Sequence, residues 1–177
     1  PCVYLSTNHK GLYEKYGFKF FDVMNDINGE PSRIYVKRTD YEIKKLCGSE
    51  ISEALALAWK VFSEYESPDY SPEGTEEFKK CLHDETYLSG MEYYGAFDEE
   101  RLVGMLGIRK EKAHICFFFV DGEYQRRGIG TALFRNLLKD YRGETITLNS
   151  SPYGVPFYKA LGFIPTEKEQ TVSGIRF

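Results

Sequence analysis

The chain has 177 residues, of which 42% are hydrophobic and 28% are charged, and its formal net charge at pH 7 is −4. This length suffices for one well-buried core and is short for two complete domains, and the composition argues against a disordered chain. The acidic balance argues against nucleic acid as the main partner, because neutralising phosphates requires a concentrated basic face, and it favours a cationic ligand.

The cysteines and histidines show no metal-site or disulfide pattern. The four cysteines lie far apart without a Cys-x-x-Cys pair: Cys2, Cys47, Cys81 and Cys116. No secretory signal or apolar stretch of membrane length is present, so we expect reduced core thiols in a cytoplasmic protein with no membrane partner. His9, His83 and His114 lack ligand spacing, so we expect no metal site.

The beginning of the chain repeats its end. Residues 5–18 match residues 148–163, and both ranges contain Tyr-x-x-x-Gly-Phe; apolar stretches follow both copies. The offset is about one compact domain in length. We therefore expect residues 1–39 to be the strand-helix-strand-strand end of a preceding, similar domain, and residues 40–177 to form a second domain. Such strands must cover apolar surface on the domain or in a partner chain, and a homodimer would provide this cover.

Apolar periodicity predicts the elements of the second domain. Their order is a strand over 41–46, a helix over 50–64, a helix from Pro72 to Leu82, strands over 92–97, 102–108 and 115–120, a helix over 129–141, a strand over 145–149, a helix over 155–161, and two final strands at Ile164 and 175–177. Ser71 before Pro72 is typical of an N-cap followed by a first-turn proline. The unbroken apolar run 115–120 indicates a central strand buried on both faces.

The loop between the strand 115–120 and the helix 129–141 is the most informative stretch. Gly128 and Gly130 have no Cβ, so a polyanion can approach the main chain there. The amides of residues 125–130 point at it from a helix N-terminus that carries partial positive charge. We expect this loop to bind a pyrophosphate; a plain strand-to-helix connection is the alternative.

Two other phosphate-binding patterns do not fit this loop. No Lys-Ser or Lys-Thr pair follows the second glycine, which argues against a nucleotide P-loop. Leu133 occupies the position of the third glycine of a dinucleotide-binding fold.

Two motifs in this order resemble the GNAT superfamily of acetyl-CoA-dependent N-acyltransferases. The first is the loop Gln/Arg-x-x-Gly-x-Gly/Ala at 125–130, and the second is the helix end Tyr-x-x-x-Gly-Phe at 158–163. The resemblance covers about residues 40–177. It implies an α/β fold with helices flanking a mixed, twisted sheet, acetyl-CoA as co-substrate, and direct acetyl transfer to a primary amine. By the same resemblance, residues 1–39 look like the end of a second GNAT domain.

The resemblance also implies a donor site. In such a site the loop would hold the pyrophosphate, and Arg126 and Arg127 would reach the adenosine phosphate. Main-chain groups of 118–120 would bind the pantetheine arm and polarise the acetyl carbonyl, and Asn149 would hydrogen-bond to the pantetheine amide. The expected set is Phe118, Phe119, Val120, Gln125, Arg126, Arg127, Gly128, Ile129, Gly130, Thr131 and Asn149. Solvated arginines and a turn-forming asparagine are the alternative interpretations.

The resemblance suggests one catalytic residue, and position suggests another. Tyr158 is the expected general acid for the thiolate, because a phenol has an ordinary pKa of about 10; aromatic packing is its alternative role. Glu123, just before the loop, is the first choice of general base, with Glu64 and Glu66 as alternatives.

The acceptor is left open by the sequence. The acidic, aromatic stretch 64–73 would suit a cationic amine, either a small molecule or a protein amine. A catalytically silent acyl-CoA-binding or sensing module, and an interaction module of a tandem protein, are the competing functions.

Overall fold

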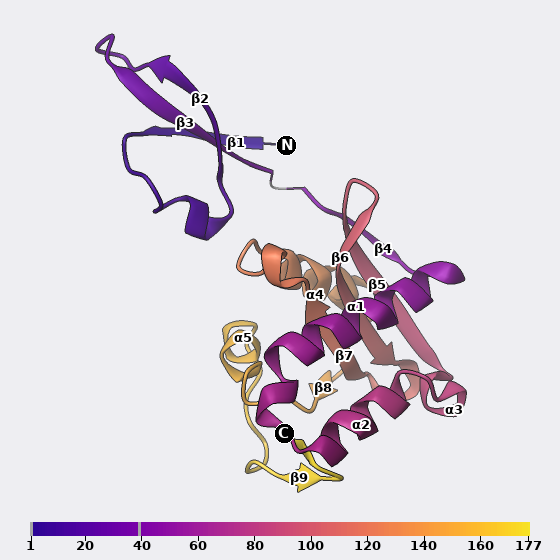
Figure 1. The fold of residues 1–177 in the computed structure, drawn as a ribbon. Coiled ribbons are helices and arrows are strands. Elements are labelled where there is room, and N and C mark those ends of the chain that lie inside the picture. Colours follow the sequence, from indigo (N-terminus) through magenta and orange to yellow (C-terminus); the bar gives the residue numbers. More distant parts are fainter. Residues whose placement is uncertain (1, 39) are drawn as a thin grey trace.

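The computed structural model describes residues 2–38 and 40–177 (Figure 1). Residues 2–38 form a three-stranded sheet that projects from the rest of the molecule. The remaining residues form a five-stranded sheet with helices on both faces and a two-stranded hairpin near the C-terminus.

The N-terminal unit consists of β1 (Cys2–Thr7), one 3-10 turn η1 (Glu14–Tyr16), β2 (Lys19–Asn25) and β3 (Pro31–Arg38), and its strand order is β1-β3-β2 with antiparallel pairing. The predicted helix is only this single turn, because Gly17 adopts a left-handed conformation at its end (φ 81°). Tyr35 is fully buried at the centre of the unit. The origin of this unit in a preceding domain stays a prediction.

The main sheet has the order β4-β5-β6-β7-β8. Its strands are β4 (Glu42–Lys45), β5 (Met91–Asp98), β6 (Arg101–Arg109), β7 (His114–Val120) and β8 (Thr147–Leu148). The first four strands pair antiparallel, and β8 pairs parallel with β7. The expected mixed sheet flanked by helices is therefore confirmed.

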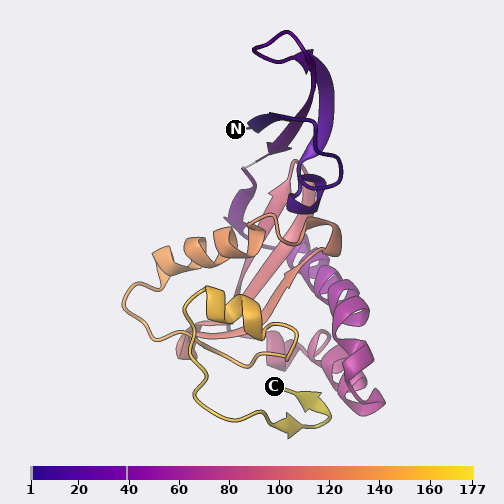
Figure 2. The same cartoon turned by 90° about the vertical axis from the view of Figure 1, so that its left-hand side faces the viewer.

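Helices cover the two faces of this sheet in separate layers (Figure 2). One layer contains α1 (Ser49–Tyr65) and α2 (Pro72–Cys81), with the 3-10 turn η2 (Ser67–Asp69) between them; the other contains α4 (Ile129–Asp140) and α5 (Val155–Ala160). A short helix α3 (Glu85–Leu88) and the 3-10 turns η3 (Lys110–Lys112) and η4 (Gly122–Tyr124) complete the elements. The Ser71 hydroxyl accepts a hydrogen bond from the amide of Gly74 at 3.1 Å, which confirms the predicted N-cap of α2.

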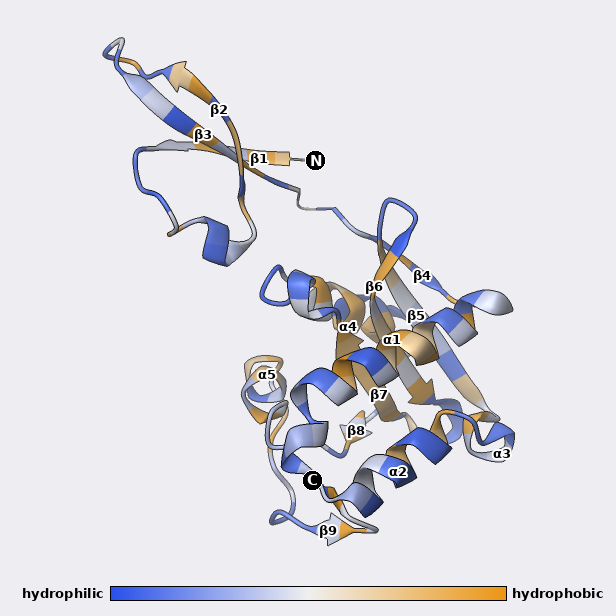
Figure 3. Ribbon diagram, in the orientation of Figure 1, coloured by the Kyte–Doolittle hydropathy of each residue, from blue (hydrophilic) through white to orange (hydrophobic). Residues whose placement is uncertain are grey.

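Each helix layer encloses its own hydrophobic cluster (Figure 3). Phe62 of α1 packs with Met105 and Phe117 on one face of the sheet, and Leu133 of α4 packs with Leu106 on the other. The predicted helix positions face the sheet because their apolar residues recur at helical spacing.

The strand β6, rather than β7, is the central strand buried on both faces. Every residue of β6 from Leu102 to Ile108 is buried, whereas only alternate residues of β7 are buried. The prediction for 115–120 is therefore wrong, because β8 pairs with β7 only at His114 and Ile115, so most of β7 is an edge strand whose alternate residues are only partly buried. A register shift opposite Gly107 and Ile108 places Ile115 under α4 and Phe117 under α1, although they are two residues apart.

The C-terminal strands differ from the prediction. β8 is much shorter than the expected strand 145–149, and Ile164 lies outside any strand with 81% of its surface exposed. The last strands, β9 (Thr171–Val172) and β10 (Ile175–Arg176), pair with each other beside α2 instead of extending the main sheet. Gly74 and Gly174 approach so closely there that a Cβ on Gly74 would collide with the Gly174 carbonyl.

All four cysteines are free thiols. Cys2 and Cys47 are exposed, so the expectation of core thiols is wrong for these two, and Cys81 and Cys116 are partly buried. Across residues 2–38 and 40–177, the helices are too short or too polar to span a bilayer.

Candidate functional site

The loop between β7 and α4 presents a row of unpaired amides. Arg126 and Gly128 both have left-handed backbone conformations, with φ values of 60° and 86°, and α4 begins at Ile129. Within the described chain, no residue accepts a hydrogen bond from the amides of 126–131. Because α4 has 12 residues, its dipole adds partial positive charge at these groups. The predicted loop can therefore receive an anion.

The two glycines of the loop serve different purposes. A Cβ at Gly128 would meet nothing within 4 Å, so glycine is needed there for its positive φ. A Cβ at Gly130 would lie 2.7 Å from Cζ of Phe157, so glycine there lets α5 pack onto the first turn of α4. Gly130 therefore has a packing role, and its role in admitting a ligand stays a prediction.

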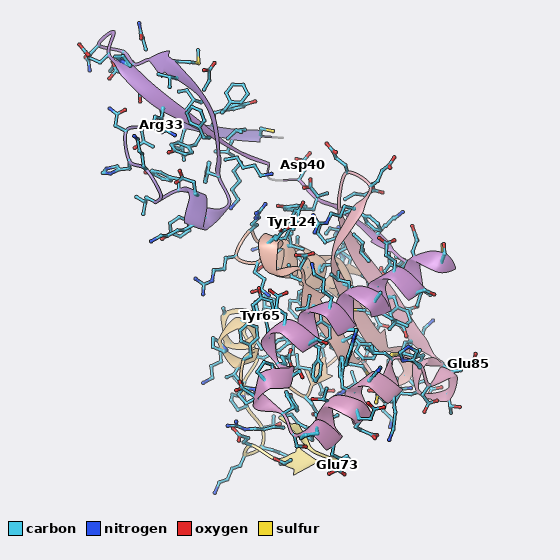
Figure 4. All side chains as sticks on the ribbon, in the orientation of Figure 1. Arg33, Asp40, Tyr65, Glu73, Glu85 and Tyr124 are labelled. Carbon is cyan, nitrogen blue, oxygen red and sulfur yellow. The ribbon has the colours of Figure 1, made fainter. Side chains whose placement is uncertain are left out.

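A basic hollow of about 530 Å³ lies along α4 next to the loop. Thr131, Arg135 and Lys139 line it at intervals of four residues, which places them on one face of α4, and Arg127 lines it from just before the helix. Arg127 also lies over the ring of Tyr124, with 4.7 Å between the guanidinium carbon and the ring centroid; Figure 4 labels Tyr124 near the linker residue Asp40. Arg126 is not part of the lining. The sequence prediction missed Arg135 and Lys139, although both follow Thr131 at four-residue intervals within the predicted helix 129–141.

The strands β7 and β8 separate beyond their first residues. β8 pairs only with His114 and Ile115. The Asp121 amide donates to the Val103 carbonyl at 3.0 Å, so in the alternating antiparallel pattern Phe119 directs its main-chain groups toward β6. Phe118 and Val120 consequently direct theirs away from β6, toward the gap.

The side chain of Gln125 closes one end of this gap. Its Nε2 donates to the Val120 carbonyl at 3.2 Å, and its Oε1 accepts from the Tyr153 hydroxyl at 2.9 Å. Tyr153 in turn stacks on Tyr65, with ring centroids 5.6 Å apart. Figure 4 shows Tyr65 at the end of α1 facing α5. These contacts connect α1, the segment before α5 and the amide-bearing loop.

Asn149 and Tyr158 line a second cavity, of about 740 Å³, that follows β8. Tyr158 is partly buried, and its ring lies 6.1 Å from that of Phe118. Burial, with a smaller contribution from the charge of Glu66, raises the pKa of the Tyr158 phenol well above its ordinary value. The structure thus brings Tyr158 to the gap beside β7 as a protonated phenol.

Glu123 lies at the surface. Its side chain is 71% exposed, and its carboxylate is 3.4 Å from Arg101. Its neighbour Asp121 is buried and accepts hydrogen bonds from Lys60 at 2.9 Å and from Arg101 at 3.0 Å. Burial opposes ionisation of Asp121, but Lys60, the Glu123 amide and Arg101 outweigh it and hold the pKa of this carboxyl below its ordinary value. Asp121 was missed by sequence reasoning, because nothing in the sequence shows that Lys60 and Arg101 meet it.

The fold and the family are established by comparison with known proteins. The profile of the acetyltransferase (GNAT) domain matches residues 66–177. A GCN5-related N-acetyltransferase from Rhodopseudomonas palustris is 22% identical, with a TM-score of 0.64 over 77% of this chain and 89% of that chain. An acetyltransferase from Trypanosoma brucei is 24% identical, with a TM-score of 0.51 over 75% and 99%.

A third similar structure is AAC(6')-Iy in complex with the bisubstrate analogue CoA-S-monomethyl-acetylneamine, with 12% identity and a TM-score of 0.52 over 73% and 94%. At these identities the structural likenesses show the fold. The profile match covers well over half of the sequence. The chain therefore belongs to the GNAT acetyltransferase family.

Proposed function

We propose that this protein transfers the acetyl group of acetyl-CoA to the amine of a small molecule. The observation that carries the proposal is the row of unpaired amides at 126–131 at the N-terminus of α4. Such a group of amides binds a pyrophosphate through hydrogen bonds and the helix dipole. The family match supports acetyl-CoA as the donor.

The donor lies across the loop and the gap in this proposal. The amides of Arg126 to Thr131 hold the pyrophosphate, because the Gln125 amide already donates to the Gly122 carbonyl at 3.4 Å. Arg127 and the hollow along α4 hold the adenosine 3′-phosphate. The main-chain groups of Phe118 and Val120 bind the pantetheine arm, and Asn149 bonds its amide. Phe119, which the sequence also suggested, is left out of the proposed donor site, because its main-chain groups face β6 and its side chain packs in the core.

The reaction follows from the position of the acetyl group beside β7. The lone pair of the amine attacks the thioester carbonyl, whose oxygen gains negative charge that main-chain N–H groups of β7 stabilise. As the C–S bond breaks, the Tyr158 hydroxyl donates its proton to the sulfur. Glu123 is the general base suggested by the sequence.

The acceptor is proposed to be cationic. The segment after α1 contains Glu66, Asp69 and Tyr70, and the chain as a whole is acidic. A related fold, AAC(6')-Iy, is described with an analogue that joins coenzyme A to an acetylated neamine. Neamine and spermidine are therefore suitable first acceptors in an assay.

The donor loop is tested by Gly128→Ala with Gly143→Ala as its matched control. Both glycines have open space at the Cβ position and similar φ values of 86° and 84°, so both substitutions should lower stability by a similar ~1 kcal/mol. We expect only Gly128→Ala to weaken acetyl-CoA binding, by about tenfold or more, because the strain reorients the amides. Calorimetric titration measures the difference; equal affinities in the two variants would contradict the proposed cradle.

The basic hollow is tested by Arg135→Ala. We expect the Kd for coenzyme A to rise about fivefold at low salt and the Kd for dephospho-coenzyme A to change little, because only the former carries the 3′-phosphate. Arg142→Ala, an exposed arginine just after α4 that does not line the hollow, is the control. A similar loss for both ligands would remove the hollow from the donor site.

A further inference from the structure

The turn η1 of the N-terminal unit touches the arginine that precedes α4. Gly17 ends this turn, and a Cβ on Gly17 would lie 2.8 Å from Cγ and 3.0 Å from Cδ of Arg127. Figures 1 and 2 both show the turn on the side of the unit that faces the loop between β7 and α4. The methylene groups of Arg127 therefore lie directly against the main chain of a unit that is far away in the sequence.

The contact requires glycine at position 17 for two reasons. Its φ of 81° is left-handed, and a side chain there would collide with Arg127. Gly29 in the same unit shares only the first property, because its φ is 84° and its Cβ would meet nothing within 4 Å. Each of the two glycine amides donates to a carbonyl of its own turn at 3.0 Å. Gly29 is therefore a matched control for the backbone effect.

An aromatic ring holds the other end of the Arg127 side chain. The guanidinium carbon lies 4.7 Å from the centroid of the Tyr124 ring. The Tyr124 hydroxyl donates to Asp98 at 3.0 Å, and the ring of Tyr41 packs edge-on against that of Tyr124, with 6.5 Å between centroids. Among residues 2–38 and 40–177, no carboxylate lies within ion-pair distance of the Arg127 guanidinium. Neutral groups thus position this guanidinium, and its charge is available to an anion.

The linker that follows β3 contributes to the same site. Asp40 and Tyr41 line the hollow together with Arg127, Arg135 and Lys139. The lining contains these three cationic side chains and only one carboxylate, that of Asp40, so the hollow attracts anions. The N-terminal part of the chain therefore meets the candidate donor site twice, through the turn η1 and through the linker (Figure 4).

The neighbouring arginine lacks these contacts. Arg126 is exposed and does not line the hollow, whereas Arg127 is partly buried and lines it. The two side chains have the same chemistry and adjacent positions in the loop. Their difference therefore comes from their surroundings, which for Arg127 include Gly17 and Tyr124.

Building on the proposed acetyl transfer, we propose that the N-terminal unit positions Arg127 for the 3′-phosphate of coenzyme A and thereby sets the preference for coenzyme A over dephospho-coenzyme A. The main chain of Gly17 restricts the methylene groups, and the ring of Tyr124 restricts the guanidinium. A long side chain that is ordered before binding loses less conformational entropy when it binds the phosphate. Gly17 and Tyr124 are positioning residues, because they act through Arg127.

The test compares Gly17→Ala with Gly29→Ala. Both substitutions strain a left-handed turn, and only the first places a methyl group against Arg127. By calorimetric titration at low salt, we expect Gly17→Ala to raise the Kd for coenzyme A about fivefold and to leave the Kd for dephospho-coenzyme A unchanged. Gly29→Ala should change neither Kd. Urea unfolding should show similar losses of stability in the two variants.

Arg127→Ala gives a second readout. In this background the methyl group of Gly17→Ala has no guanidinium to displace, so the double variant should bind coenzyme A as Arg127→Ala does. Tyr124→Leu, which removes the ring beside the guanidinium, should likewise raise the Kd for coenzyme A only when Arg127 is present. Tyr124→Leu keeps the inference testable if Gly17→Ala does not fold. A general loosening of the structure would not depend on Arg127 in this way.

The possible contradictions differ from one another. Equal affinities of Gly17→Ala and Gly29→Ala for coenzyme A would exclude positioning by the N-terminal unit while acetyl transfer stands. A loss in Gly17→Ala that persists undiminished in the Arg127→Ala background would exclude Arg127 as the intermediary. Equal binding of coenzyme A and dephospho-coenzyme A by the wild type would overturn 3′-phosphate recognition and the inference with it. Failure of the wild-type protein to bind acetyl-CoA would overturn the proposed function itself.

Discussion

Replacement of Tyr158 by phenylalanine lowers kcat for acetyl transfer by an expected factor of about 10²–10³, which is typical of the loss of a general acid. The ring remains, so its packing against Phe118 and Phe163 is retained. Only the proton donor to the departing thiolate disappears. The affinity for acetyl-CoA should be unchanged, because no donor-binding group is removed.

The pH dependence of the wild-type enzyme follows from the same residue. Because burial raises the pKa of Tyr158, the phenol stays protonated well above pH 10, and its ionisation should produce no basic limb in kcat below that pH. A basic limb that starts near pH 8 and disappears in Tyr158→Phe would contradict the burial seen here.

Tyr141→Phe is a matched control for Tyr158→Phe. Tyr141 is also buried, and its hydroxyl donates to Glu92 at 3.0 Å on a different part of the molecule. Its loss should lower stability by about 1 kcal/mol through one hydrogen bond and leave kcat unchanged. Equal kcat values in the wild type and Tyr158→Phe, measured by release of free thiol, would remove Tyr158 from the reaction.

Replacement of Asp121 by alanine should give the largest loss of stability, about 2–3 kcal/mol. Its side chain is 3% exposed and receives hydrogen bonds from Lys60, Arg101 and the amide of Glu123. Removing one partner from a buried ion pair costs about 3–5 kcal/mol. The value is reduced here because Lys60 and Arg101 are 52% and 51% exposed and regain water.

The contribution of the Asp121 charge depends on pH. Its pKa is lowered in the folded protein, so the stabilisation is present above the ordinary aspartate pKa of about 4 and is lost as the pH falls through the lower, folded value. Asp121→Asn should therefore be less stable than the wild type at pH 7, and this difference should be smaller at pH 3. Urea unfolding at both pH values measures this, with Glu100→Gln as an exposed control. A pH-independent difference would assign the effect to packing.

The fold was predictable where local pattern decides the structure. Strands near 92–97 and 102–108 follow from apolar runs separated by a turn, and Ser71 and Pro72 specify the start of α2 through a hydrogen bond within a few residues. The length of β8 was not predictable, because it depends on how far β7 continues beside it. Likewise, Ile164 resembles a strand residue, but the hairpin of β9 and β10 forms next to α2.

The site was predictable in its main chain and less so in its side chains. Gly128 made the loop recognisable, because a left-handed backbone conformation at one position favours glycine there whatever the rest of the fold does. The exposure of Glu123 and its pairing with Arg101, like the burial of Asp121 beside Lys60 and Arg101, depend on contacts between residues far apart in the sequence. Burial and ion pairs of this kind form only when the helices pack on the sheet, so they cannot be read from local sequence.

The contact between Gly130 and Phe157 has a mechanical consequence. Phe157 directly precedes Tyr158, and its ring fits against the main chain of the first turn of α4. Because the ring lies so close to the main chain, a ligand that moves the first turn of α4 would also move α5. If the loop and Tyr158 act as proposed, binding of the donor at the start of α4 and the position of the tyrosine hydroxyl depend on the same packing contact.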